Sequence, residues 1–106
     1  MSDDKTEQAE KILKPLRNQI DRIDSEIIEK LNQRTGIVLE VARTKARYNL
    51  EYHDPHREAK VYKRLAELNR GPFPDSGIHS VYREIMSASL SLEKPLKGAY
   101  LGPKGT

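Results

Sequence analysis

The longest regular pattern of apolar positions in the chain has the period of an α-helix. Between Leu16 and Tyr48 the apolar residues recur every three or four positions, and no proline interrupts them. Residues spaced in this way share one face of a helix, so the pattern predicts a single helix of about 32 residues. Pro15 suits the first turn of that helix, although an earlier start with a kink at the proline is also open.

A second, shorter helix is predicted after a break at residues 49–53. Asp54 can cap a helix through its carboxylate, and the following Pro55 occupies the first helical position, where a missing backbone N–H does no harm. The apolar pattern then continues to about Asn69.

A third helix is predicted after the loop Arg-Gly-Pro-Phe-Pro at residues 70–74. Asp75 or Ser76 can cap it, and it should end near Glu93, before the proline of the pair at 94–95. The sequence therefore predicts an all-α fold with one long helix, two shorter helices and no sheet.

The first predicted helix is too long for the chain to cover by itself. About 32 residues rising by about 1.5 Å each give a rod of roughly 48 Å, whereas a compact domain of this size has a radius of gyration of about 13 Å. Two shorter helices cannot bury the whole apolar stripe of such a rod. A second copy of the chain is the simplest partner, so a homodimer is expected.

Composition agrees with pairing and excludes several classes of protein. Only 36% of the 106 residues are hydrophobic, Trp is absent and Phe occurs once, which leaves a thin core for a monomer. The lack of cysteine excludes disulfides and thiolate metal sites. No apolar run approaches the roughly 20 residues that span a bilayer, and MSDDKTEQAEK is no signal peptide. We expect a cytoplasmic protein without a membrane partner.

The formal net charge of +3 fits a nucleic-acid surface, a pocket for an anionic small molecule, or simply solvated side chains. The placement of the cations along the first helix separates these readings. Arg34 and Lys45 fall near the middle of the apolar stripe, while Arg17 lies on its flank. A buried cation is costly unless a negative group meets it. An internal ion pair, or a long side chain that reaches from the edge of the stripe to water, would explain one such cation. Two cations on one apolar stripe favour an interior that binds an anion.

Polar residues also fall on the predicted buried faces of the other two helices. Each has an ordinary explanation: Asp54 as a cap, Ser89 as a hydroxyl bonded back to its own helix, and Glu93 as a solvated residue near a helix end. Taken together they surround one bundle interior, which is where helical proteins place ligand sites. The candidate set is Arg34, Lys45, Asp54, Arg57, Glu58, Ser89 and Glu93.

The sequence lacks the residue patterns of several other kinds of functional site. His53, His56 and His79 do not share the spacing of metal ligands on a helix, so no metal is expected. No glycine-rich phosphate loop opens a helix, and no nucleophile stands beside a general base. The alternative to an enzyme is a helical dimerisation module that binds nucleic acid through the basic outer face of the first helix. Because the most unusual cations point inward, no nucleic-acid partner is expected.

Four stretches of the sequence carry a family pattern. They are LRNQIDRIDSEIIEKLNQR at 16–34, the spacing from Arg34 to Lys45, HDPHRE at 53–58 and IHSVYREIMSASLSLE at 78–93. Over these residues the chain resembles the all-helical chorismate mutases. The tail GAYLGPKGT at 98–106 is similar to the first strand and loop of a prephenate dehydratase domain. The resemblance implies a polar extension at 1–14, a mutase domain at 15–94, and a linker with the start of a truncated dehydratase domain at 95–106.

The resemblance implies that the chain converts chorismate to prephenate in phenylalanine and tyrosine biosynthesis, as an intertwined homodimer and without a cofactor. Arg17 from the other protomer and Arg34 would grip the two carboxylates of chorismate. Lys45 would contact a carboxylate and the ether oxygen whose bond to carbon breaks.

The remaining roles implied by the resemblance concern the ring hydroxyl and the ether oxygen. Asp54, through its backbone, and Glu58 would hold the hydroxyl, with Arg57 nearby. Ser89 would assist at a carboxylate, and Glu93 would face the ether oxygen. A concerted rearrangement needs no nucleophile or metal, only a substrate held in a reactive conformer and donors aimed at the growing charge.

Overall fold

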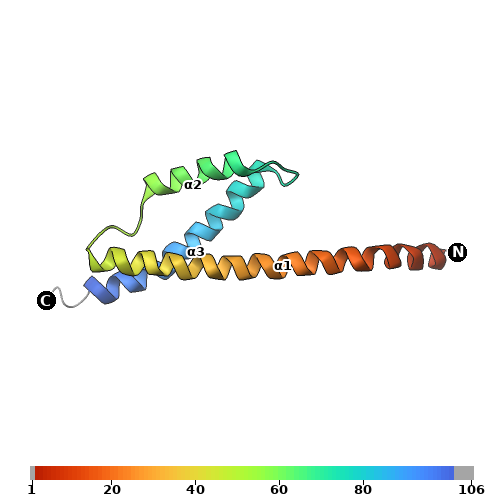
Figure 1. Ribbon diagram of the computed structural model, residues 1–106, viewed down its shortest axis with the longest axis horizontal. Coiled ribbons are helices and arrows are strands. Elements are labelled where there is room, and N and C mark those ends of the chain that lie inside the picture. Colours follow the sequence, from red (N-terminus) through yellow and green to blue (C-terminus); the bar gives the residue numbers. More distant parts are fainter. Residues whose placement is uncertain (1, 102–106) are drawn as a thin grey trace. The chain divides into compact units, whose positions relative to one another are not determined.

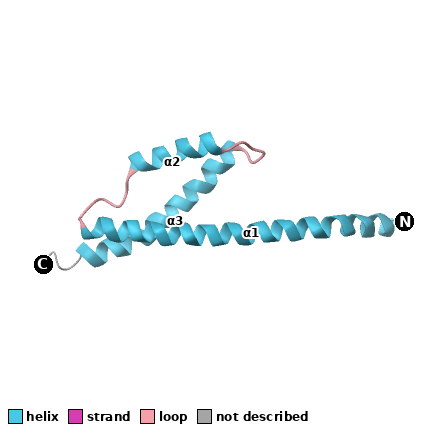
Figure 2. Cartoon of the chain, viewed as in Figure 1, coloured by secondary structure: helices cyan, strands magenta, loops and turns pink. Residues whose placement is uncertain are grey.

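The computed structural model describes residues 2–101, and within that range it has three helices and no strand (Figures 1 and 2). The helices are α1 (Ser2–Arg47), α2 (Pro55–Leu68) and α3 (Asp75–Leu101). The predicted all-α fold is confirmed. The chain divides into two units, one ending at Thr35 and the other beginning at Gly36, so that α1 passes through both.

Helix α1 begins well before the start predicted at Pro15 and Leu16. It begins at Ser2 and contains Pro15 in its interior, so the earlier start is the correct one and the polar segment before the proline is helical. Asp3 and Asp4 lie in the first turn, where negative charge favours a helix N-terminus. The residues between are mostly strong helix formers, which offsets the one backbone hydrogen bond that a proline removes.

The end of α1 agrees with the predicted break at Asn49. This residue has a positive φ of 56°, which asparagine tolerates better than most residues. Its N–H donates to the carbonyl of Ala46 at 3.2 Å, and the N–H of Leu50 donates to the carbonyl of Lys45 at 2.7 Å. The two bonds form a Schellman motif. The last turn of α1, which carries Lys45, is therefore held by its own backbone.

Helix α2 has the predicted cap and the predicted end. The Oδ1 of Asp54 accepts a hydrogen bond from the N–H of Arg57 at 3.0 Å, and Pro55 takes the first helical position. After Leu68, the side-chain amide of Asn69 donates to the carbonyl of Phe73 at 2.9 Å. This bond closes the loop to α3, which packs against α2 (Figure 1).

Helix α3 begins at the predicted place but is not capped by Asp75 or Ser76. It begins at Asp75, whose Oδ1 accepts a hydrogen bond from the Asn69 amide at 2.6 Å. The carbonyl of Pro74 instead accepts the bonds from the backbone N–H groups of Gly77 and Ile78, both at 3.0 Å.

The predicted end of α3 near Glu93 is wrong, because the helix continues across Pro95 to Leu101. Residues 98–101, predicted as the start of a strand, are therefore helical, and the rest of that predicted strand and loop, 102–106, lies outside the described residues. A strand needs a neighbouring strand for its backbone hydrogen bonds, and residues 2–101 contain none. A helix makes its backbone hydrogen bonds within itself, and Pro95 removes only the one bond that its missing N–H would have donated.

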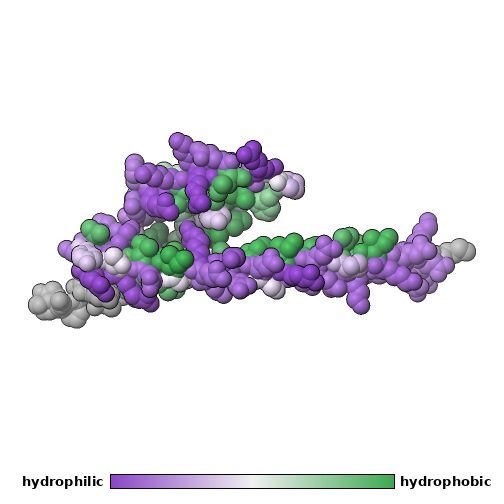
Figure 3. Space-filling view, viewed as in Figure 1, coloured by the Kyte–Doolittle hydropathy of each residue, from purple (hydrophilic) through white to green (hydrophobic). Residues whose placement is uncertain are grey.

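The single chain buries very little apolar surface. Among the side chains that the structure describes, the buried hydrophobic ones are Ala42 and Ala46, and the buried polar ones are Ser89 and Glu93. Larger apolar side chains of α1 stay open to solvent, and Figure 3 shows them gathered along one edge of its N-terminal part. The buried side chains described are therefore two small alanines of α1 and two polar residues of α3, and no large apolar side chain is fully buried among them.

Candidate active site

Lys45 is the centre of the charged groups in the second unit. It lies in the last turn of α1 and is half-buried. Its positive charge acts to lower the pKa of Asp54 and opposes the burial that raises the pKa of Glu93, so Lys45 stands near the cap of α2 and near the C-terminal half of α3. Figure 1 shows that α3 crosses the end of α1 there. The structure thus brings together three predicted site residues that come from three different parts of the chain.

Glu93 is the most buried ionisable residue among those described, with 7% of its surface exposed. Desolvation by burial raises the pKa of its carboxyl group, and the charge of Lys45 opposes that rise. Burial is the larger effect, so the pKa stays above its ordinary value of 4.5. The carboxyl group therefore keeps its proton to a higher pH than a free glutamate, and it can donate a hydrogen bond.

Asp54 lies on the surface and serves as the cap of α2. The hydrogen bond from the N–H of Arg57 is the main cause that lowers the pKa of its carboxyl group, with smaller contributions from the charges of Lys45 and His56. Desolvation, the second-largest effect, acts in the other direction. The capping explanation of its side chain is confirmed, and its backbone carbonyl accepts a hydrogen bond from the N–H of Glu58 at 3.1 Å.

Glu58 and Ser89 already have partners within the chain. One carboxylate oxygen of the half-buried Glu58 lies 3.3 Å from Nε2 of His53. The buried hydroxyl of Ser89 donates to the carbonyl of Ile85 at 2.9 Å, which is the back-bonded arrangement considered from the sequence. Arg57 has an exposed side chain.

Arg17 and Arg34 belong to the first unit. The exposed Arg17 forms an ion pair with Glu10, with 2.9 Å between Nη1 and Oε2. Arg34 is half-buried. On one helix, 17 residues correspond to about 25 Å along the axis. Their Cα atoms are therefore much further apart than the two carboxylates of one small ring compound.

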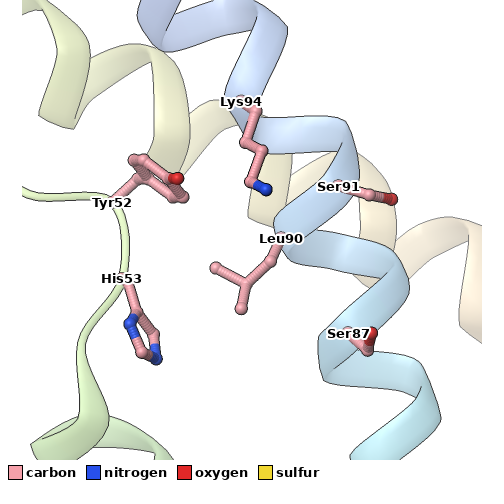
Figure 4. Close-up of a pocket in the computed structure, with 6 residues that line it drawn as sticks. All are labelled: Tyr52, His53, Ser87, Leu90, Ser91 and Lys94. Carbon is pink, nitrogen blue, oxygen red and sulfur yellow. The ribbon is translucent and has the colours of Figure 1, made fainter.

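A pocket of about 380 Å³ opens between the loop before α2 and α3, and Figure 4 shows Leu90 projecting from α3 into the space before His53. None of the eight predicted site residues lines it. At about 100° per residue, the pocket residues of α3 lie about 100° or more from Ser89 and Glu93, except that Leu90 lies only about 60° from Glu93. The α3 residues that line the pocket are spaced by three, four and seven positions, as residues on one helical face are. This spacing was the sequence signal that could have indicated the pocket. The lining residues are Tyr52, His53, Ser87, Leu90, Ser91 and Lys94.

A second hollow of about 310 Å³ lies where α2 meets the start of α3. Tyr62 and His79 stack in it, with ring centroids 4.1 Å apart and an interplanar angle of 18°. Across residues 2–101, no three histidine, aspartate or glutamate side chains gather in a way that could hold a metal ion. None of the helices described is long and apolar enough to cross a membrane.

These features define an all-helical domain in which a half-buried lysine lies near a buried carboxyl group of raised pKa, and further cations stand on a long helix. The family model described as chorismate mutase type II matches residues 16–94, and the chain belongs to this family. That match begins at the apolar stripe of α1 and ends one residue after Glu93.

Curated relatives of the chain include two-activity proteins. It is 46% identical over 98 residues to the bifunctional chorismate mutase/prephenate dehydratase of Aquifex aeolicus, which covers 89% of this chain and 27% of the relative. The protein of the same name from Neisseria gonorrhoeae is 43% identical over 100 residues, covering 92% of this chain and 26% of the relative. The chain therefore spans about a quarter of the length of these relatives.

Two solved structures of chorismate mutase from Thermus thermophilus have the same fold. The form II structure has a TM-score of 0.75 and 38% identity, covering 77% of this chain and 93% of that chain. The form I structure has a TM-score of 0.71 and 36% identity, covering 73% of this chain and 96% of that chain. Both structures are thus similar to this chain in sequence as well as in backbone fold.

Proposed function

We propose that this chain catalyses the Claisen rearrangement of chorismate to prephenate by electrostatic stabilisation and by holding the substrate in its reactive conformer. The observation that carries the proposal is the pairing of Lys45 with Glu93, a half-buried ammonium beside a buried carboxyl group whose pKa is raised. The reaction is a concerted shift within one molecule, so it needs neither a nucleophile nor an external proton.

The two groups supply the donors that the transition state needs. As the C–O bond of the substrate stretches, negative charge grows on the ether oxygen, and donors fixed in advance around that oxygen lower the barrier. Lys45 donates from its ammonium group and Glu93 donates as a neutral acid. Both are poorly solvated, which strengthens their electrostatic effect.

The other predicted residues bind and shape the substrate in this proposal. Arg17 and Arg34 hold the two carboxylates, which selects the chair-like conformer in which the reacting carbons are close. The backbone of Asp54 and the carboxylate of Glu58 hold the ring hydroxyl. Two more residues complete the set: Arg57 beside the hydroxyl and Ser89 at a carboxylate.

We further propose that the active form is an intertwined homodimer whose two sites each take residues from both chains. Four apolar side chains on one face of α1 in the first unit are between 48% and 56% exposed. A second chain is the partner that can bury them. Arg17 and Arg34 stand about 25 Å apart on that helix, so one substrate can meet both only if they come from different chains. The four exposed apolar side chains are those of Leu16, Ile20, Ile23 and Ile27.

In a longer protein, residues 95–106 would lead into a prephenate dehydratase domain. The similarity of GAYLGPKGT to the start of such a domain supports this proposal, as do the names and lengths of the curated relatives. The helical state of residues 98–101 in this chain implies that they would have to convert to a strand when the domain's sheet is present.

The proposed activity is tested by following the absorbance of chorismate after purified protein is added without any metal or cofactor. We expect the absorbance to fall much faster than in a protein-free control. A heat-denatured sample of the same protein should behave like that control. Loss of chorismate at the spontaneous rate alone would remove the proposed activity.

Mixing two inactive variants tests the shared sites. In a mixture of Arg17→Ala and Arg34→Ala proteins, a heterodimer carries both changes in one site and neither in the other. At equal concentrations about half of the dimers should be mixed, so about a quarter of the sites should regain activity. The measurement is the specific activity of the mixture against that of each variant alone. Exchange of subunits without any recovery of activity would contradict sites built from two chains.

A further inference from the structure

The contact between Glu10 and Arg17 joins a substrate-binding candidate to a residue outside the family match. Oε2 of Glu10 lies 2.9 Å from Nη1 of Arg17, and the matched region begins only at residue 16. Seven residues are about two helical turns, so both side chains lie on the same face of α1. Lys14 stands four residues from Glu10, at the spacing that helical ion pairs commonly use, yet Glu10 contacts Arg17.

The direction of the side chains explains the contact. Side chains of a helix lean toward its N-terminus, so the long Arg17 reaches back along α1 toward Glu10. Both residues belong to the first unit, and their side chains are 59% and 55% exposed. Ion pairs this exposed contribute little to folding. The pair is thus a poor stabiliser of the helix, but it occupies the guanidinium group that the proposed function gives to the substrate.

We propose that Glu10 is a positioning residue that competes with a substrate carboxylate for Arg17 and so lowers the affinity for the dianionic substrate. This inference rests on the proposed role of Arg17. When the substrate binds, its carboxylate replaces that of Glu10 on the guanidinium group, and Glu10 then stands as a negative charge close to a dianion. Both effects oppose binding.

The competition should appear in KM and leave kcat unchanged. The carboxylates of the substrate keep their charge through the rearrangement, so Arg17 binds ground state and transition state nearly equally. A change in such uniform binding alters KM alone. A residue that merely holds the helix together would not separate the two constants in this way.

The test is Glu10→Gln, which keeps the length and helix propensity of the side chain and removes its charge. Because exposed ion pairs are weak, we expect KM for chorismate to fall about two- to fivefold, with kcat unchanged, at low ionic strength. The fall should shrink at about 0.5 M salt, where charges are screened over a few ångströms. Glu7→Gln is the matched control: it removes the same charge one turn further away, about 15 Å along the helix from Arg17.

A double variant shows whether Glu10 acts through Arg17. In an Arg17→Ala background, Glu10→Gln should leave KM where Arg17→Ala alone puts it. An unchanged or higher KM in the single Glu10→Gln variant would overturn the inference, and so would the same fall in KM in the Arg17→Ala background. Wild-type protein without mutase activity would defeat the proposed function. Active wild-type protein whose KM does not respond to Glu10→Gln defeats this inference alone.

Discussion

Replacing Lys45 by alanine should lower kcat by about 10²- to 10³-fold, the range seen when one donor to a developing oxyanion is removed. The same change should have little effect on the free energy of unfolding. Lys45 is half-buried, and its charge acts on Glu93, whose carboxyl group is already inclined to keep its proton. Without Lys45 the pKa of Glu93 rises further, so the buried carboxyl group takes up a proton more readily and is less often an unpaired buried charge.

Replacing Arg34 by alanine should weaken substrate binding. A guanidinium bound to a carboxylate makes charge-assisted hydrogen bonds worth about 1.5–3 kcal/mol, so KM should rise at least about tenfold. Steady-state kinetics and urea unfolding, measured on the same preparations, separate activity from stability. Lys30→Ala and Arg22→Ala are matched controls, since both residues are exposed cations on α1 and should leave kinetics unchanged.

The opposite pattern would give these cations a structural role. If Lys45→Ala or Arg34→Ala unfolds by several kcal/mol more easily while its folded fraction stays fully active, the side chain serves an internal ion pair. The proposed electrostatic catalysis would then lose the residue concerned.

The fold could be predicted where short-range signals act alone. Asn49 ends α1 and Asp54 with Pro55 begins α2, because an asparagine at positive φ, a capping carboxylate and a first-turn proline each work within a few residues. The two errors also share a cause. Pro15 and Pro95 were both interpreted as helix boundaries, although each removes only one hydrogen bond and neighbouring residues continue the helix.

The candidate site was predictable as a set of polar residues on apolar faces, and less so as a set of contacts. Lys45 is close enough to influence both Asp54 and Glu93, although Asp54 lies on the surface and not in the predicted interior. The contact of Glu58 with His53 depends on the geometry of a loop, which no helical period describes. The contact of Arg17 with Glu10 reaches into the polar segment before Pro15, where a helix was only one of the alternatives left open.

The balance of burial and charge at Glu93 could not be ranked from the sequence, and it determines the second large effect. Turnover should fall as pH rises through the folded-state pKa of Glu93, because only the neutral acid can donate to the ether oxygen and a carboxylate there would repel the growing charge. Burial raises that pKa above 4.5 despite the charge of Lys45, so the fall begins at a higher pH than for a free glutamate. Glu93→Gln should flatten it, since an amide donates without titrating. Glu93→Ala should be poor at every pH.

The free energy of unfolding should also depend on the protonation of Glu93, and it should fall as pH rises, as turnover does. The folded chain holds the Glu93 proton more tightly than the unfolded chain does, so this group's contribution is complete below the unfolded pKa near 4.5. It is lost as pH rises through the folded pKa. Urea unfolding over that window should show the loss in wild type and not in Glu93→Gln, whereas Glu84→Gln, which removes an exposed carboxylate from α3, should keep it. A turnover profile equally flat in wild type and in Glu93→Gln would exclude Glu93 as a donor and leave Lys45 to stabilise the ether oxygen by itself.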